Sequence, residues 1–270
     1  MSRALLLVWS LMVVLGLGAC SSNPFSAASQ AKPAEDEPDS RRPTPPRDNR
    51  TRAKSHTDLG SLYLQNKNYQ VALEELTMAI VVDPDYAKAH GTRGLVLYYI
   101  GEMQLADRDF QNALNIDPND PELHNNYGWF LCQIGREKEG LPFLQRAMKN
   151  RLYETPERAY VNAGACYIKL GELDTAEGLI QHSLQIMPNN PQALLQLADI
   201  NYRRGDLQRA SDQLTDLIRK AKPNAEALWL MVRVERKLGD RLAEARYTAQ
   251  LKRNFPLSPE AQELLKGNFE

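Results

Sequence analysis

The sequence has almost no excess of one charge: 33 lysines and arginines face 34 aspartates and glutamates, so its formal net charge is −1. Binding to nucleic acid phosphates needs a concentrated basic surface, so this balance argues against nucleic acid as a partner. The chain also lacks G-x-S-x-G, H-E-x-x-H, C-x-x-C and a phosphate-binding loop. These absences leave catalysis without a recognisable motif. We therefore expect a protein that is not an enzyme and uses no cofactor.

No apolar run is long enough to cross a membrane. The longest, residues 4–17, has about 14 residues, whereas a spanning helix needs about 20. With Arg3 before it, this run is typical of the core of a signal peptide. It ends in LGAC, which resembles the lipobox of bacterial lipoproteins, whose cysteine is acylated and becomes the mature N-terminus. An ordinary signal peptide with a chance cysteine near its cleavage site is the alternative.

The lipobox resemblance implies a signal peptide over residues 1–19 and a lipid anchor on Cys20. In lipoprotein sorting, an aspartate after the cysteine retains the protein at the inner membrane. Ser21 stands there instead, which implies the outer membrane, with the protein facing the periplasm. Residues 20–52 contain six prolines and one large apolar residue, Phe25. Such a segment buries too little surface to offset its ordering entropy, so we predict a disordered, proline-rich tether.

Glycine recurs at a fixed interval beyond the tether. Gly101, Gly135, Gly171, Gly205 and Gly239 are spaced by 34, 36, 34 and 34 residues. A period of 34 residues with helical content is the signature of tetratricopeptide repeats. With these glycines at position 15, the repeats span residues 53–86, 87–120, 121–156, 157–190, 191–224 and 225–258.

Small residues at positions 8 and 20 test this register independently, because the two helices of each hairpin cross most closely there. Five of the six repeats have Gly or Ala at both positions, and the sixth has Val232 and Glu244. A degenerate last repeat is typical of the end of a stack. We predict an all-α superhelical solenoid of about six helix-turn-helix repeats, closed by a capping helix within residues 259–270.

Groove-lining residues follow from this register. Positions 2, 5, 9, 12 and 13 share one side of the first helix of each repeat, the side that lines the concave groove in this repeat family. Asn126 and Asn162 occupy position 6, where an amide can hold the backbone of a bound peptide. The alternative is that both amides only bond between helices of the solenoid. The predicted partner-binding residues are Leu64, Tyr98, Tyr99, Asn125, Asn126, Trp129, Gln133 and Asn162.

Histidines and cysteines suggest other sites. His56, His90 and His124 recur at position 4, but equivalent positions on stacked hairpins lie about 10 Å apart, too far to share one zinc ion. We therefore predict no metal site. Cys132 and Cys166 lie at positions 12 and 10 of adjacent repeats. A disulfide is possible in an oxidising compartment, but the two point to different sides of their helices, so we favour buried free thiols.

Basic residues collect at the groove positions of the last two repeats. Such charge usually marks a solvated face. The alternative is a patch for an acidic partner or for anionic lipid headgroups. The residues are Arg203, Arg233, Arg236 and Lys237.

Two segments indicate which family of tetratricopeptide repeat proteins the chain resembles. Residues 106–136, with the run NNYG, and residues 153–177, with ETPERAY and N-x-G-x-C-Y, resemble the type IV pilus pilotins of the PilF/PilW family. The resemblance covers nearly all of the repeats and the lipobox. It implies a monomeric outer-membrane lipoprotein, carrying palmitate or a similar acyl chain, that binds subunits of the pilus secretin (PilQ-like) and promotes their outer-membrane localisation and oligomerisation. Such a protein would be needed for pilus biogenesis and twitching motility.

Other assignments share the same repeats and lipobox. One is a periplasmic scaffold lipoprotein of the NlpI type that recruits cell-wall hydrolases, and another is an outer-membrane protein assembly component resembling BamD. The NNYG and ETPERAY segments favour the pilotins. Pro142 departs from the family pattern, because a proline inside a helix costs about 3 kcal/mol unless the helix starts late or kinks. We therefore expect a possible bend of the solenoid in repeat 3.

Overall fold

The structure, a computed structural model, describes residues 49–269, which contain thirteen helices and no strand. The fold is therefore all-α, as the sequence predicts. No helix among residues 49–269 has the length and hydropathy needed to cross a membrane. The predictions for the signal peptide, for Cys20 and for the tether up to residue 48 lie outside the described residues.

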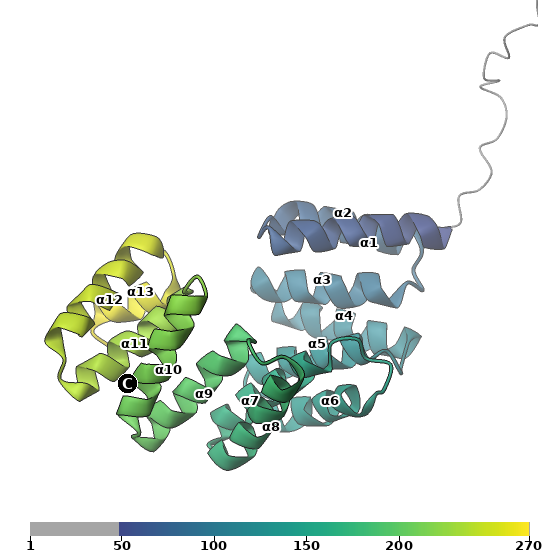
Figure 1. Ribbon diagram of the computed structural model, residues 1–270. Helices are drawn as coiled ribbons and strands as arrows, with labels where there is room; N and C mark the ends of the chain where they lie inside the picture. The colour runs from purple at the N-terminus through teal and green to yellow at the C-terminus, as the bar shows by residue number, and fades with distance from the viewer. Residues whose placement is uncertain (1–48, 270) are drawn as a thin grey trace, which may run out of the picture. The chain divides into compact units, whose positions relative to one another are not determined.

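The helices follow one another in hairpins joined by short turns (Figure 1). Their bounds are α1 Asn49–Gln65, α2 Tyr69–Val82, α3 Ala87–Tyr99, α4 Met103–Ile116, α5 Pro121–Gln133, α6 Glu137–Lys149, α7 Pro156–Leu170, α8 Leu173–Ile186, α9 Pro191–Arg204, α10 Leu207–Lys220, α11 Ala225–Leu238, α12 Arg241–Asn254 and α13 Pro259–Lys266.

Neighbouring hairpins stack in chain order. Each odd-numbered helix up to α11 packs on the even-numbered helix that follows it, and also on the next odd-numbered helix. The last helix, α13, packs on α11 and α12. Contacts therefore run only between neighbours along the stack, which is the organisation of a helical solenoid.

Glycine ends the first helix of most repeats. Gly171, Gly205 and Gly239 cap α7, α9 and α11 with φ values of 78°, 83° and 81°. This left-handed region strains any residue with a Cβ atom, which explains the 34-residue recurrence. Repeat 1 has Lys67 at the same position, with φ of 59°, the only positive φ of a non-glycine residue among those described.

Close helix crossings account for the small residues at positions 8 and 20. A Cβ atom on Gly140 of α6 would lie 2.6 Å from the carbonyl oxygen of Gly128 of α5, a distance that real Cβ atoms do not reach. Ala106 and Ala176 are fully buried at the equivalent place in repeats 2 and 4. The two backbones therefore approach too closely for any larger side chain.

The boundary between the tether and the first repeat differs from the sequence prediction. α1 begins at Asn49, so residues 49–52 are helical and do not belong to the tether. α6 runs without a break from Glu137 to Lys149. Pro142 lies inside it as an exposed residue, so the proline does not end the helix. α13 spans Pro259–Lys266 and ends at Gly267, which takes a φ of 73°, so the predicted capping helix is present within residues 259–270.

Buried polar groups bind the first repeats together. Arg93 of α3 donates to both carboxylate oxygens of Asp109 of α4, at 2.6 and 2.9 Å. His90 and His124 each contact a proline carbonyl oxygen of the preceding turn through Nε2, Pro84 and Pro118 respectively, at 2.9 Å. No group of metal-ligating side chains forms within the described part of the chain. His90 and His124 therefore join repeats 2 and 3 to the repeat before each of them.

Candidate partner-binding groove

Aromatic side chains form a continuous cluster across repeats 1 to 3. Tyr98 meets Trp129 edge to face, with ring centroids 5.0 Å apart, and meets Tyr99 at 5.2 Å. Tyr99 in turn stacks on Tyr69, the first residue of α2, at 5.5 Å and an interplanar angle of 9°. α2, α3 and α5 thus each contribute to one surface, which we call the aromatic cluster: Tyr69, Tyr98, Tyr99 and Trp129.

The aromatic cluster is only partly covered by the fold. Tyr99 is 49% exposed, while Tyr98 and Trp129 are half-buried. Burial raises the pKa of Tyr98 and of Tyr99, so both phenols stay protonated at neutral pH. Rings held by their neighbours, with hydroxyls available to donate, supply contact area at a low cost in conformational entropy.

A hollow of about 350 Å³ lies along the first helices of repeats 1 to 4. Leu64 of α1 lines it, and Leu64 also packs with Tyr69 against the buried cluster that contains Leu76 and Val96. Leu95 and Asn126 also line it, and they precede Tyr98 and Trp129 by three residues on α3 and α5, so the hollow lies next to the aromatic cluster. Its other lining side chains include Thr57, Ser61 and Arg158.

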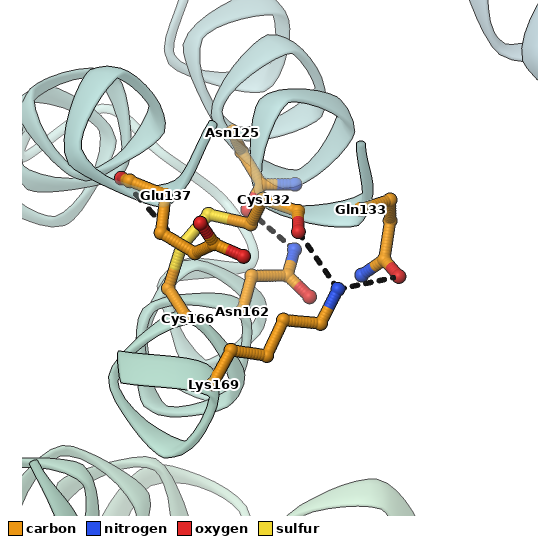
Figure 2. The surroundings of a disulfide bond; sticks show 7 residues. All are labelled: Asn125, Cys132, Gln133, Glu137, Asn162, Cys166 and Lys169. Carbon is orange, nitrogen blue, oxygen red and sulfur yellow. Dashed lines mark hydrogen bonds between the residues drawn. A yellow bond between two sulfur atoms is a disulfide. The ribbon is translucent and has the colours of Figure 1, made fainter. Parts of the chain in front are cut away.

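The three asparagines have different roles. Asn125 is 1% exposed, and its Oδ1 accepts a hydrogen bond from Asn162 Nδ2 at 2.9 Å (Figure 2). Because it is buried, Asn125 cannot meet a partner, which corrects its assignment to the groove. The bond from Asn162 ties α7 to α5, as the structural alternative required. Asn126 lines the hollow; its Oδ1 accepts from Asn125, and its amide nitrogen has no partner within residues 49–269.

Cys132 and Cys166 form a disulfide between α5 and α7, with a Cα–Cα distance of 5.6 Å (Figure 2). The prediction of free thiols was wrong. It treated each helix alone and found the two side chains on different sides. Two adjacent helices, however, face each other through different sides, so position 12 of one repeat meets position 10 of the next. The bond links repeats 3 and 4 across 34 residues of sequence.

Lys169 closes the same junction. Its Nζ donates to the carbonyl oxygen of Cys132 at 2.7 Å and to Gln133 Oε1 at 3.4 Å (Figure 2). Burial lowers the pKa of Lys169. Gln133, predicted to face a partner, therefore takes part in the α5–α7 junction as a second acceptor for Lys169, which also satisfies one of the last carbonyl groups of α5.

The predicted basic patch lies on α9 and α11, and two of its four cations are paired with carboxylates. Arg203 pairs with Asp199 at 2.7 Å, and Arg236 pairs with Glu244 at 2.7 Å. Arg233 and Lys237 lie over the ring of Tyr202, at 4.6 and 4.3 Å from its centroid. Much of this charge therefore stabilises the last repeats.

The structure thus divides the predicted groove into two parts. Tyr98, Tyr99 and Trp129 come together, with Leu64 and Asn126 along the adjacent hollow, whereas Asn125, Gln133 and Asn162 form the α5–α7 junction. Tyr69 was missed, because it starts a second helix and the groove was assigned to first helices. Its signal was an aromatic residue at the first position of α2.

Comparison with known proteins supports the repeat architecture. The chain matches tetratricopeptide repeat families over residues 59–125, 110–141 and 167–234.

Two proteins share both sequence and structure with this chain. The type IV pilus assembly protein PilF of Pseudomonas aeruginosa is 31% identical over 209 residues, which cover 77% of this chain and 83% of PilF. The crystal structure of PilW, described as a widely conserved type IV pilus biogenesis factor, superimposes with a TM-score of 0.67 at 32% identity and covers 79% of this chain and 98% of PilW. A solved structure of P. aeruginosa PilF gives a TM-score of 0.63 at 30% identity, over 81% of this chain and 99% of PilF.

Proposed function

Because the chain belongs to the PilF/PilW family of type IV pilus biogenesis proteins, we propose that it is a pilotin. In this proposal it is a non-catalytic outer-membrane lipoprotein that binds subunits of the pilus secretin (PilQ-like). It brings them to the outer membrane and promotes their oligomerisation. Repeat proteins of this family generally act as scaffolds, which fits the absence of catalytic motifs from the sequence.

The aromatic cluster is the observation that carries the proposal. Tyr and Trp side chains dominate the energetics of protein interfaces, and here they form one partly exposed surface across three helices. The adjacent hollow adds the free amide nitrogen of Asn126, which can donate to a backbone carbonyl of a bound segment. An extended segment of a secretin subunit would place apolar side chains on the rings and its backbone along the hollow.

A lipid anchor on Cys20 would keep this groove near the membrane where the secretin assembles. Residues 20–48 would then form a tether that spans roughly 30 Å root-mean-square if it behaves as a flexible chain. Acyl chains contribute about 0.8 kcal/mol per buried methylene, so several chains on one cysteine give a practically permanent anchor.

Replacing the acylated cysteine tests the anchor and its purpose together. Cys20→Ala should move the protein out of the outer-membrane fraction and reduce the amount of multimeric secretin there. Ser21→Ala, next to it, should leave both unchanged. Outer-membrane fractionation of Cys20→Ala like the wild type would contradict the lipid anchor. Unchanged secretin multimers in cells that lack the whole protein would contradict the pilotin role.

A further inference from the structure

The last described residues turn back over α11. Gly267 ends α13 in the left-handed region, and the backbone N–H of Asn268 then donates to the carbonyl of Glu263 at 3.1 Å. The Asn268 side chain donates to the Glu263 carboxylate at 2.7 Å. These bonds fix the direction of the turn and place Phe269 beside α11.

Phe269 is held through both its ring and its backbone. Its ring lies 5.4 Å from that of Trp229, and the Arg236 guanidinium lies 3.9 Å from the ring centroid. Arg233 Nε donates to the Phe269 carbonyl oxygen at 3.3 Å. An arginine over an aromatic face is attracted by the electrons of the ring, and more strongly when the pair is shielded from water.

The residues that hold Phe269 occupy the groove positions of repeat 6. Trp229, Arg233 and Arg236 are positions 5, 9 and 12 of that repeat. The chain therefore places one of its own short segments on a surface built like a peptide site, with an aromatic platform and a donor for a backbone carbonyl. We call the surface formed by Tyr202, Trp229, Arg233, Arg236 and Lys237 the cationic–aromatic surface.

Two cations of this surface keep unneutralised charge. Arg236 pairs with Glu244, but Arg233 and Lys237 have no carboxylate within salt-bridge distance among residues 49–269. Both lie instead over the ring of Tyr202. A ligand with carboxylates beside an aromatic residue would complement this arrangement, and the chain's own Phe269 is followed in sequence by Glu270.

We propose that the cationic–aromatic surface is a second peptide-binding site, which the chain's own Phe269 closes. Its partner is an extended protein segment that carries an aromatic residue flanked by acidic residues. The partner segment replaces Phe269 on Trp229 and Arg236, and its acidic groups meet Arg233 and Lys237. This site shares no residue with the aromatic cluster, so the proposal can be tested independently of the pilotin proposal.

Occupation of the site by Phe269 of the same chain determines how tightly a separate partner binds there. A short tether holds the competing segment at an effective concentration in the millimolar range. A partner in trans therefore binds weakly while Phe269 is seated, and its apparent affinity rises when that segment is removed. Any interaction that draws residues 267–269 away from α11 opens the site.

The test uses a chain that stops after Lys266, which keeps all of α13, beside the full chain. Both are titrated with the acetylated peptide Asp-Asn-Phe-Glu-Asp up to about 5 mM, above the effective concentration of a short tether. The NMR signal of the Trp229 indole N–H reports binding. We expect a dissociation constant of about 1 mM or tighter for the shortened chain and at least roughly fivefold weaker binding to the full chain. Arg233→Ala in the shortened chain should weaken its binding to the peptide, and a peptide with Ala in place of Phe should not bind.

Four results would overturn the proposal. The first is an unchanged Trp229 signal in the shortened chain, and the second is equal affinity for the shortened and full chains. The third is a loss of folded repeat 6 in both the shortened chain and the full-length Phe269→Ala variant, which would make the segment a structural cap. Binding of the shortened chain to phosphatidylglycerol vesicles, but not to the peptide, would assign the surface to lipid headgroups and also reject it.

Discussion

At the scale of single residues, the α3–α4 hairpin contains a charge pair that is largely hidden from water. The Asp109 side chain is 6% exposed and that of Arg93 is 22% exposed. Burial by itself raises the pKa of Asp109, but the hydrogen bonds from Arg93, together with the ring of His90 3.6 Å away, outweigh it and lower that pKa. Asp109 therefore stays ionised in the folded protein, and its loss would leave a guanidinium without its counter-charge.

Asp109→Asn should lower the free energy of unfolding at pH 7 by roughly 2–3 kcal/mol, less than for a fully buried pair because Arg93 is partly exposed. Because the pKa of Asp109 is lower in the folded protein than the ordinary aspartate pKa of 3.8, ionised Asp109 stabilises the folded state at pH values above 3.8. This stabilisation is lost as the pH falls through the lower pKa of the folded state. The difference between variant and wild type should therefore shrink below that pH in urea unfolding experiments. Asp216→Asn, at an exposed pair, is the matched control and should cost less than about 0.5 kcal/mol. A pH-independent difference would show that the charge of Asp109 is not responsible.

Side-chain partners were the part of the site that the sequence predicted least well. The position of Asn125 on its helix was assigned from spacing, yet its burial depends on how far α7 rotates against α5. The same rotation decides whether Cys132 and Cys166 face each other. Spacing within one helix contains no information on that rotation. Tyr98, Tyr99 and Trp129, in contrast, all lie on the groove side of the first helices of adjacent repeats, so assigning that side from the spacing is enough to predict that they lie close together.

At the scale of helices and turns, position 15 of each repeat sets the hairpin. Five repeats have glycine there with a positive φ, and repeat 1 has Lys67 at φ 59°. The 34-residue glycine period predicted the fold because every hairpin needs a residue with a positive φ at this position. The last residues could not be predicted in this way, since Asn268 and Phe269 lie beyond the last repeat and follow no period.

Lys67→Gly should raise the free energy of unfolding by about 1 kcal/mol, because it removes the left-handed strain of a side-chain-bearing residue. The greater freedom of glycine in the unfolded chain offsets part of the gain. Gly101→Ala is the reverse control: a Cβ atom there would meet no atom within 4 Å, so only the φ of 89° penalises it. We expect a loss of about 1 kcal/mol for that variant. A lower melting temperature for Lys67→Gly would contradict the role given to this position.

The α5–α7 disulfide should stabilise the middle of the stack. A loop of 34 residues closed by a disulfide stabilises the folded state by roughly 3–4 kcal/mol in the chain-entropy treatment. Cys132→Ala with Cys166→Ala should remove this stabilisation. Reducing agent should lower the melting temperature of the wild type toward that of the double variant and leave the variant unchanged. Equal sensitivity of both proteins to reduction would show that the disulfide is not the source.

At the scale of the whole molecule, the stack is stabilised by contacts between neighbours, so its two ends can serve different partners. The aromatic cluster lies on repeats 1 to 3 and the cationic–aromatic surface on repeats 5 and 6. In a solenoid, changing one end alters stability locally, since each repeat contacts only its neighbours. Substitutions at one surface should therefore leave binding at the other intact.

The affinity of the purified, lipid-free protein for soluble secretin subunits decides whether the aromatic cluster is the secretin-binding site. Trp129→Ala and Tyr99→Ala should each cost about 2 kcal/mol, a loss of about thirtyfold measured by titration calorimetry, because truncating a central interface aromatic has this effect. Asn126→Ala should cost about 1 kcal/mol, the value of one hydrogen bond. Leu257→Ala, at a residue 88% exposed and far along the chain, is the control and should bind like the wild type. Wild-type affinity in folded Trp129→Ala and Tyr99→Ala would contradict the account and move the secretin site off the aromatic cluster.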